Sequence, residues 1–171
     1  GVLDKFMGDA LMAVYGIPYP QPDDAVRAVR TALNMKRALV EYNERRARDS
    51  LMPIRIGIGI NTDEVLSGNM GSSKRMDYTV IGDGVNVSAR LESLNKQYGT
   101  DILLSETTRG QIGDAFCVRP IDIVVTKGKS HPVEIFEALG GADHEPTAAQ
   151  ARYVEALEVY RAGDFARARD M

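Results

Sequence analysis

The stretch LDKFMGDALMAVYG, residues 3–16, decides the first part of the fold, together with YTVIGDGVNVSAR at residues 78–90. The first stretch predicts a β-hairpin, in which Val2 to Phe6 forms one strand, Gly8-Asp9 the turn and residues 10–15 an apolar return strand. Asp9 has two interpretations. Asp is a common turn residue that hydrogen-bonds its own backbone, whereas a carboxylate at the tip of a rigid hairpin also suits Mg²⁺. This stretch alone favours the first interpretation.

The second stretch predicts a strand, a turn and a helix in direct succession. Residues 76–81 read as the strand, 82–84 as a glycine-containing turn, and 85–94 as the helix. Asn86 and Arg90 are four positions apart on that helix, so their side chains share one face. An amide and a guanidinium therefore point in the same direction.

Composition bounds the classes of protein to which the chain can belong. Its 171 residues, 44% of them hydrophobic, suffice for one domain with a sizeable core. The net charge of -3 provides no basic surface for nucleic acid, so we expect no nucleic-acid partner. A single cysteine excludes an internal disulfide framework. The sequence shows no apolar run of membrane-spanning length and no signal peptide.

The rest of the chain mixes helices with hairpins. The spacing of apolar residues predicts helices at 25–48 and 106–112, strands at 54–60 and 102–104, and two antiparallel strands at 116–125 and 133–139 around the turn KGKSHP. Interleaved helices and strands with several hairpins favour an α+β fold, with a mostly antiparallel sheet covered by helices.

Four motifs in this order resemble a known family. DKFMGDALMAVYG and YTVIGDGVNVSARLES are accompanied by RIGIGINTDEVLSGNMGS between them and VVTKGKSHPVEIFEAL after them. Over residues 1–139 the chain resembles the class III nucleotidyl cyclase catalytic domain, the family of adenylyl and guanylyl cyclases. The resemblance implies a ferredoxin-like cyclase core, which we expect to be N-terminally truncated, with its first strand and helices upstream of Gly1.

The domain organisation follows from this resemblance and a change in composition. We expect the catalytic domain at 1–139, a linker at 140–150 and a helical C-terminal extension at 151–171. The extension resembles half of a tetratricopeptide-like helical hairpin and could begin a helical-repeat region, but one copy cannot show a repeat. A single amphipathic helix that packs on its own domain is the alternative.

The resemblance implies an adenylate cyclase of signal transduction. Such an enzyme converts ATP to 3′,5′-cyclic AMP and pyrophosphate, with two divalent metal ions, Mg²⁺ or Mn²⁺, in each site. Asp9 matches one of the two metal-binding aspartates of the family. The other aspartate lies on a strand upstream of Gly1, so we expect little activity from residues 1–171 alone.

The remaining site residues carry over from the same motifs. The resemblance implies that Asn86 orients the ribose and that Arg90 stabilises charge on the α-phosphate. It further implies that Arg55 and Lys127 bind phosphates, although by position alone Arg55 could equally be a solvent-exposed residue at a strand edge.

Base recognition is assigned to Lys5 and Thr79. A lysine donor at N1 and an acceptor at N6 select adenine, and guanylyl cyclases typically carry Glu where this chain has Lys5. The commonest family residue at Thr79 is Asp. A hydroxyl both donates and accepts, so Thr79 predicts softer discrimination between the two bases.

The family also implies the assembly and the setting of the domain. Both halves of the composite site occur in this chain, so we expect a homodimer with two equivalent sites. We expect a cytoplasmic catalytic domain, and upstream sensor or membrane domains in the parent protein.

Two alternatives remain within the family, a non-catalytic nucleotide-binding or dimerisation module and a guanylate cyclase. The GGDEF-type turn of diguanylate cyclases is absent, since Ala-Leu follows Gly8-Asp9.

Overall fold

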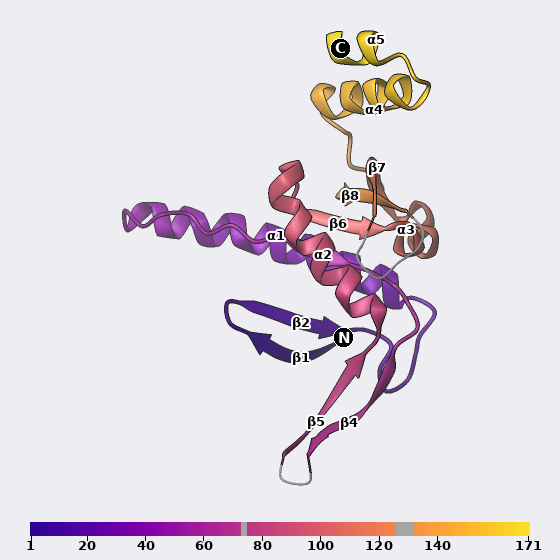
Figure 1. Cartoon of the computed structure of the whole chain (residues 1–171). Helices are drawn as coiled ribbons and strands as arrows, with labels where there is room; N and C mark the ends of the chain where they lie inside the picture. The colour runs from indigo at the N-terminus through magenta and orange to yellow at the C-terminus, as the bar shows by residue number, and fades with distance from the viewer. Residues whose placement is uncertain (73–74, 126–131) are drawn as a thin grey trace.

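The computed structural model describes residues 1–72, 75–125 and 132–171 (Figure 1). Its elements in chain order are β1 (Val2–Met7), β2 (Ala10–Val14), α1 (Asp24–Arg48), β3 (Ile58–Ile60), β4 (Leu66–Ser72), β5 (Arg75–Ile81), α2 (Asp83–Tyr98), β6 (Ile102–Ser105), α3 (Glu106–Ile112), a 3₁₀ turn (Gly113–Ala115), β7 (Phe116–Val124), β8 (Val133–Gly141), α4 (Ala148–Arg161) and α5 (Phe165–Asp170).

A four-stranded sheet in the order β3-β6-β8-β7 forms the centre of the fold. β3 and β6 run parallel, whereas β8 is antiparallel to both β6 and β7. All four residues of β6 are buried, as expected for an apolar strand covered on both faces. Helices with a mostly antiparallel sheet confirm the predicted α+β fold class.

Two hydrophobic cores lie on opposite faces of this sheet. Along β6 the side chains alternate, so Ile102 and Leu104 belong to one core and Leu103 to the other. The first core includes Val29 of α1, and the second includes Leu91 of α2, and both of these residues are fully buried. The sheet is therefore sandwiched between α1 and α2.

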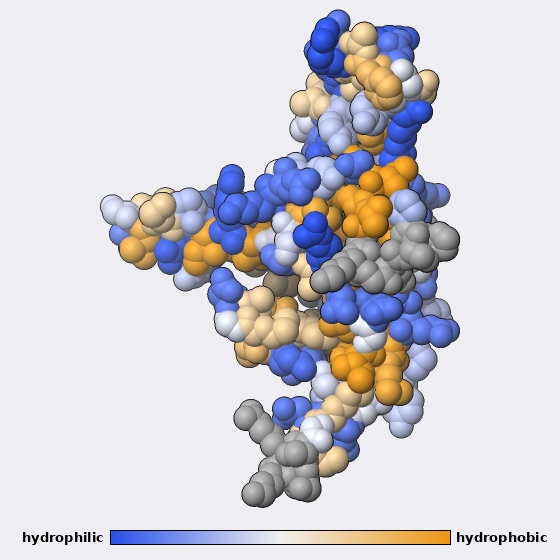
Figure 2. Space-filling model, viewed as in Figure 1, coloured by the Kyte–Doolittle hydropathy of each residue, from blue (hydrophilic) through white to orange (hydrophobic). Residues whose placement is uncertain are grey.

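Helix α1 extends well beyond the sheet (Figure 1). Its buried residues, Ala25, Val29 and Ala32, all lie in its first turns, whereas Val40 and Tyr42 are exposed. Apolar surface is visible on the projecting part of α1 and near the base of the β4–β5 hairpin in Figure 2. The sequence-based expectation of a helix covering a sheet holds for the first third of α1.

Two hairpins project from the central body. β1 and β2 pair antiparallel, and so do β4 and β5, each as a separate two-stranded sheet. The β1–β2 hairpin confirms the prediction for residues 2–15, including a turn at Gly8-Asp9.

Helix α4, which precedes the short last helix α5, contacts strand β7. The Tyr153 hydroxyl donates a hydrogen bond to the Ile121 carbonyl at 2.7 Å, and the Arg119 guanidinium lies 4.9 Å from the centre of the Tyr153 ring. Arg161 forms an ion pair of 2.6 Å with Glu134 of β8. These contacts fasten α4 to the β7–β8 pair.

The structure differs from the sequence-based prediction at residues 54–60, where only Ile58–Ile60 forms a strand. The Asn43 side chain makes both hydrogen bonds to the backbone of Ile54, each 2.8 Å long. An asparagine on α1 therefore takes the place of a neighbouring strand at this position. None of the helices in the described ranges is both long and apolar enough to cross a membrane.

Candidate functional site

The candidate site begins at an irregularity in strand β1. Leu3 pairs with Ala13 and Lys5 with Met12, so Asp4 is an extra residue in the ladder, a β-bulge. A bulge re-aims side chains that strict alternation would send to opposite faces. It turns the Asp4 carboxylate inward, where 1% of that side chain is exposed.

Asp4 connects two residues that are distant in sequence. Its Oδ2 accepts a hydrogen bond of 2.9 Å from the Thr79 hydroxyl on β5, across 75 positions of the chain. The same oxygen lies 3.4 Å from Lys5 Nζ. The structure thus brings together Lys5 and Thr79, the two residues predicted to recognise the base, through a carboxylate that the sequence analysis did not single out.

Asn86 and Arg90 lie on the first half of α2, and both are exposed. The predicted helix at 85–94 is confirmed within the longer Asp83–Tyr98. Because β5 ends at Ile81 and α2 starts at Asp83, this helix face directly follows the strand that carries Thr79.

Helix α2 is held against β3 by hydrogen bonds from side chains to backbone carbonyls. The Ser88 hydroxyl donates to the Gly59 carbonyl at 2.8 Å, and the Asn95 amide donates to the Ile58 carbonyl at 3.0 Å. The Asn95 carbonyl oxygen in turn accepts a hydrogen bond from the Thr100 hydroxyl at 2.9 Å. At the start of α2, Asn61 donates to the Gly84 carbonyl at 3.0 Å. These bonds fix the position of the helix face that carries Asn86 and Arg90.

A half-buried tyrosine anchors the other end of α2. The Tyr98 hydroxyl donates a 2.5 Å hydrogen bond to Asp122 Oδ2 on β7. Burial, and then the hydrogen bond and charge of Asp122, raise the pKa of Tyr98 to about 12, because removing the proton would leave two negative groups in contact. Tyr98 therefore stays neutral and keeps α2 tied to the sheet.

Asp9 lies exposed at the turn of the β1–β2 hairpin. In Figure 1 this turn is at the end of the hairpin remote from β5 and from the start of α2. Within one chain, then, Asp9 is not brought together with Asn86 and Arg90. No group of three or more His, Cys, Asp or Glu residues within the described ranges could hold a metal ion. Mg²⁺ is commonly bound by one or two carboxylates together with substrate phosphates and water, so Asp9 fits as a single protein ligand.

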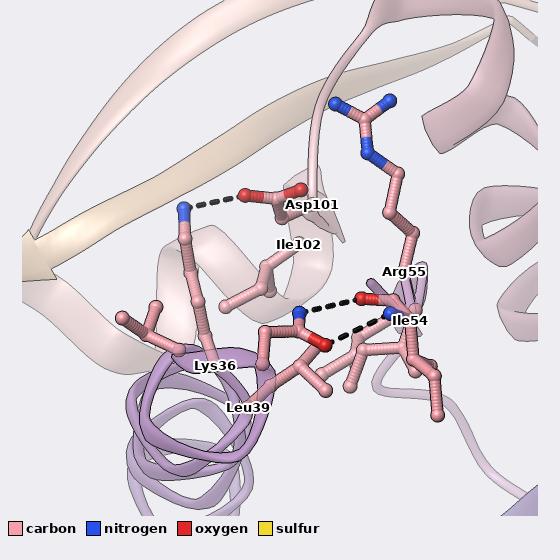
Figure 3. Close-up of a pocket in the computed structure, with 10 residues that line it drawn as sticks. Lys36, Leu39, Ile54, Arg55, Asp101 and Ile102 are labelled. Atoms are coloured by element: carbon pink, nitrogen blue, oxygen red, sulfur yellow. Dashed lines mark hydrogen bonds and ion pairs between the residues drawn. The ribbon is translucent and has the colours of Figure 1, made fainter. Parts of the chain in front are cut away.

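Arg55 is exposed in the extended segment before β3 and lines a pocket of about 150 Å³ between that segment and α1 (Figure 3). Lys36 and Asp101 form an ion pair of 2.7 Å there, and the Arg55 guanidinium points away from Leu39 and Ile54. Arg55 thus remains available to a ligand outside the pocket. The predicted phosphate-binding residue Lys127 and its turn lie outside the described residues.

Asp4 and Asn95 are two of the site-supporting residues that sequence reasoning missed. Asp4 is adjacent to Lys5, but strand alternation would place neighbouring side chains on opposite faces, and nothing in the sequence signals the bulge. Asn95 lies near the end of a helix whose other polar residues are mostly exposed. A buried amide can satisfy its polar atoms only against backbone groups that the sequence does not position.

Comparison with known proteins gives the family. Residues 5–137 match the family model described as the adenylate and guanylate cyclase catalytic domain. The chain is 39% identical over 147 residues to the terminal-differentiation specific adenylate cyclase of Dictyostelium discoideum, a match that covers 82% of this chain and 7% of that protein. It spans less than a third of the length of the first curated relatives it matches.

Solved structures share the fold. The crystal structure of the guanylyl cyclase Cya2 has a TM-score of 0.74 and 41% identity, over 86% of this chain and 73% of that chain. The adenylyl cyclase CyaB from P. aeruginosa has a TM-score of 0.76 and 33% identity, over 85% of this chain and 75% of that chain.

Proposed function

Because the chain belongs to the class III adenylate and guanylate cyclase catalytic domain family, we propose that the protein is an adenylate cyclase that converts ATP to 3′,5′-cyclic AMP and pyrophosphate. The observation that carries this proposal is the Lys5–Asp4–Thr79 group, which presents a donor and a hydroxyl side by side. Adenine offers an acceptor at N1 and a donor at N6, and Lys5 and Thr79 complement these two atoms.

The reaction joins two ends of the same substrate. The ribose 3′-oxygen attacks the α-phosphorus, a new P–O bond forms, and the bond from that phosphorus to pyrophosphate breaks. Asn86 would hold the ribose ring, because its amide both donates and accepts hydrogen bonds. Arg90, on the same face of α2, would meet the charge that grows on the α-phosphate, where a preorganised cation has the largest effect on rate.

Phosphate binding involves residues outside this helix face. Arg55 and Lys127 would bind phosphate oxygens, and Asp9 would hold a divalent metal ion, Mg²⁺ or Mn²⁺. Members of this family generally use divalent ions, and two of them per site would lower the pKa of the attacking hydroxyl and neutralise the triphosphate.

A homodimer with shared sites accounts for the placement of Asp9. Its hairpin tip points away from α2 of its own chain (Figure 1), which supports a site in which Asp9 of one protomer faces Asn86 and Arg90 of the other. Two-fold symmetry would then create two equivalent sites.

The direct test is product formation by the full-length protein. Purified protein is incubated with ATP or GTP in the presence of Mg²⁺ or Mn²⁺, and cyclic AMP and cyclic GMP are quantified separately. We expect cyclic AMP to dominate and Arg90→Ala to lower its formation about 10²–10³-fold. If the wild type forms neither product, this result supports a non-catalytic nucleotide-binding module instead.

Guanylate cyclase is the second candidate. It is favoured by the likeness to the guanylyl cyclase Cya2 at 41% identity. Dominant cyclic GMP in the same assay would establish it and reject the assignment of ATP as the substrate.

A further inference from the structure

The carboxylate of Asp4 is the most deeply buried charged side chain next to the candidate base site, with 1% of its surface exposed. Its Oδ2 accepts the Thr79 hydroxyl at 2.9 Å and lies 3.4 Å from Lys5 Nζ. The bulge in β1 turns this side chain toward β5, and bulges commonly re-aim side chains next to active sites.

This contact decides which way the Thr79 hydroxyl points. A threonine hydroxyl has one hydrogen to donate and two lone pairs that accept. An ionised carboxylate only accepts, so the one hydrogen of Thr79 must lie toward Asp4. Only 7% of Thr79 is exposed, which leaves little room for water to compete for that hydrogen. Any ligand that reaches the oxygen therefore meets lone pairs.

We propose that Asp4 is a specificity-determining residue, which turns Thr79 into an acceptor-only group and thereby makes the site select adenine over guanine. This inference rests on the proposed cyclase function and deepens it. The Lys5 ammonium has only hydrogens to offer, so the pair presents a donor beside an acceptor. Adenine N1 and N6 match this pattern. Guanine presents a donor at N1 to the ammonium and an acceptor at O6 to the lone pairs, and both contacts are mismatched.

The sequence alone predicts softer discrimination, because an isolated threonine can donate to guanine O6 as readily as it accepts from adenine N6. With Asp4 in place, Thr79 has the polarity of the aspartate that is commoner at its position. Asp4 touches the base only through Thr79 and Lys5, so it is a positioning residue.

The test compares Asp4→Asn with wild type in the full-length protein, using kcat/KM for ATP and for GTP. The asparagine amide has nearly the same shape but can donate to Thr79, which frees the threonine hydrogen to point toward the base. We expect the ATP-to-GTP ratio to fall about tenfold, the effect of one hydrogen bond of altered polarity. We also expect kcat/KM for GTP to rise in absolute terms. Loss of structure alone would lower kcat/KM for ATP and for GTP by the same factor.

The matched control is Asp77→Asn, the same chemical change on exposed Asp77, two positions before Thr79 on β5. It should keep the wild-type ratio. In a Thr79→Val background no hydroxyl remains to be oriented, so adding Asp4→Asn should change the ratio by less than about twofold. If Asp4→Asn does not fold by circular dichroism, Asp4→Ser is measured in its place, since serine can also donate to Thr79.

The possible failures are distinguishable. If the wild type forms no cyclic nucleotide, the proposed function fails. If the wild type prefers GTP, the cyclase reaction stands and the role of Asp4 is overturned. If the wild type prefers ATP but Asp4→Asn lowers ATP and GTP turnover equally, or shifts the ratio just as far in the Thr79→Val background, Asp4 is only a structural residue.

Discussion

Gly59→Ala tests whether the position of α2, and with it the candidate site, depends on one close backbone approach. A Cβ at Gly59 would lie 2.9 Å from the Leu91 carbonyl carbon, and closer still to the Ser88 carbonyl oxygen and the Glu92 nitrogen. These are all backbone atoms of the helix, so no flexible side chain can move aside. The strand and the helix must separate instead.

The cost can be worked from these contacts. Carbon atoms pack best at about 3.5–4.0 Å, so α2 must retreat by roughly 1 Å. Overpacking of this kind costs about 1–3 kcal/mol, and a backbone obstacle belongs at the upper end of that range. The retreat also stretches the Ser88–Gly59 and Asn95–Ile58 hydrogen bonds, at about 1 kcal/mol each. Reduced freedom of the unfolded chain returns up to about 1 kcal/mol, so we expect a net loss of about 4 kcal/mol.

The measurement is urea unfolding of the purified protein followed by far-ultraviolet circular dichroism. At a slope of about 2 kcal/mol per molar urea, the midpoint should fall by about 2 M. Gly110→Ala is the matched control, because an added Cβ there meets no atom within 4 Å and the residue is exposed in α3. It should raise stability by about 0.5–1 kcal/mol. Equal midpoints for Gly59→Ala and wild type would refute the close-approach argument.

Three further predictions concern the site and its support. Arg90→Ala should lower kcat for ATP about 10²–10³-fold with little change in KM, since a transition-state donor is lost; an unchanged kcat would remove Arg90 from the mechanism. Mixed dimers of Asp9→Ala with Asn86→Ala/Arg90→Ala should recover about a quarter of wild-type activity, because about half the dimers are mixed and each has one intact site; verified subunit exchange without recovery would contradict a shared site. The pKa of Tyr98 is raised from 10.0 to about 12, so the folded state keeps a proton that the unfolded chain loses, and stability should fall as pH rises through this interval. Alkaline unfolding curves should show a smaller fall for Tyr98→Phe, and an identical fall would mean that the Tyr98 pKa is not raised.

Local pattern was enough to predict most of the elements. Gly8-Asp9 between apolar strands predicted the first hairpin, and helical spacing predicted the long helix that begins at Asp24. The strand predicted at 54–60 proved shorter, because Asn43 satisfies the Ile54 backbone from a helix. A hydrogen bond from a side chain to a backbone eleven residues away does not alter the spacing of apolar residues, so the spacing could not predict it. How far α1 projects beyond the sheet was equally inaccessible, since apolar spacing does not show how much of a helix is covered.

The site was predictable where one short segment carries its residues. Asn86 and Arg90 share a face because helix geometry fixes their relation once the helix has formed. The sequence could not predict that Asp4 contacts both Lys5 and Thr79. It depends on a bulge at Asp4 and on a contact across 75 positions, and neither is encoded in local spacing.

Asn86 and Arg90 are held in place by different contacts from those that hold Asp9, and this difference has a consequence for catalysis. The face with Asn86 and Arg90 belongs to a helix bonded to β3 along its length and to β7 through Tyr98. Asp9 occupies the tip of a two-stranded hairpin that forms its own sheet. Isolated two-stranded hairpins have little stability of their own, so the hairpin tip can shift more readily than the helix. In the proposed reaction, ribose and α-phosphate would therefore be held by a rigid helix face. The alignment of the Asp9 carboxylate with that face would depend on what packs against the hairpin. Contacts to the hairpin should for this reason alter kcat more strongly than contacts to α2 that leave its helix face in place.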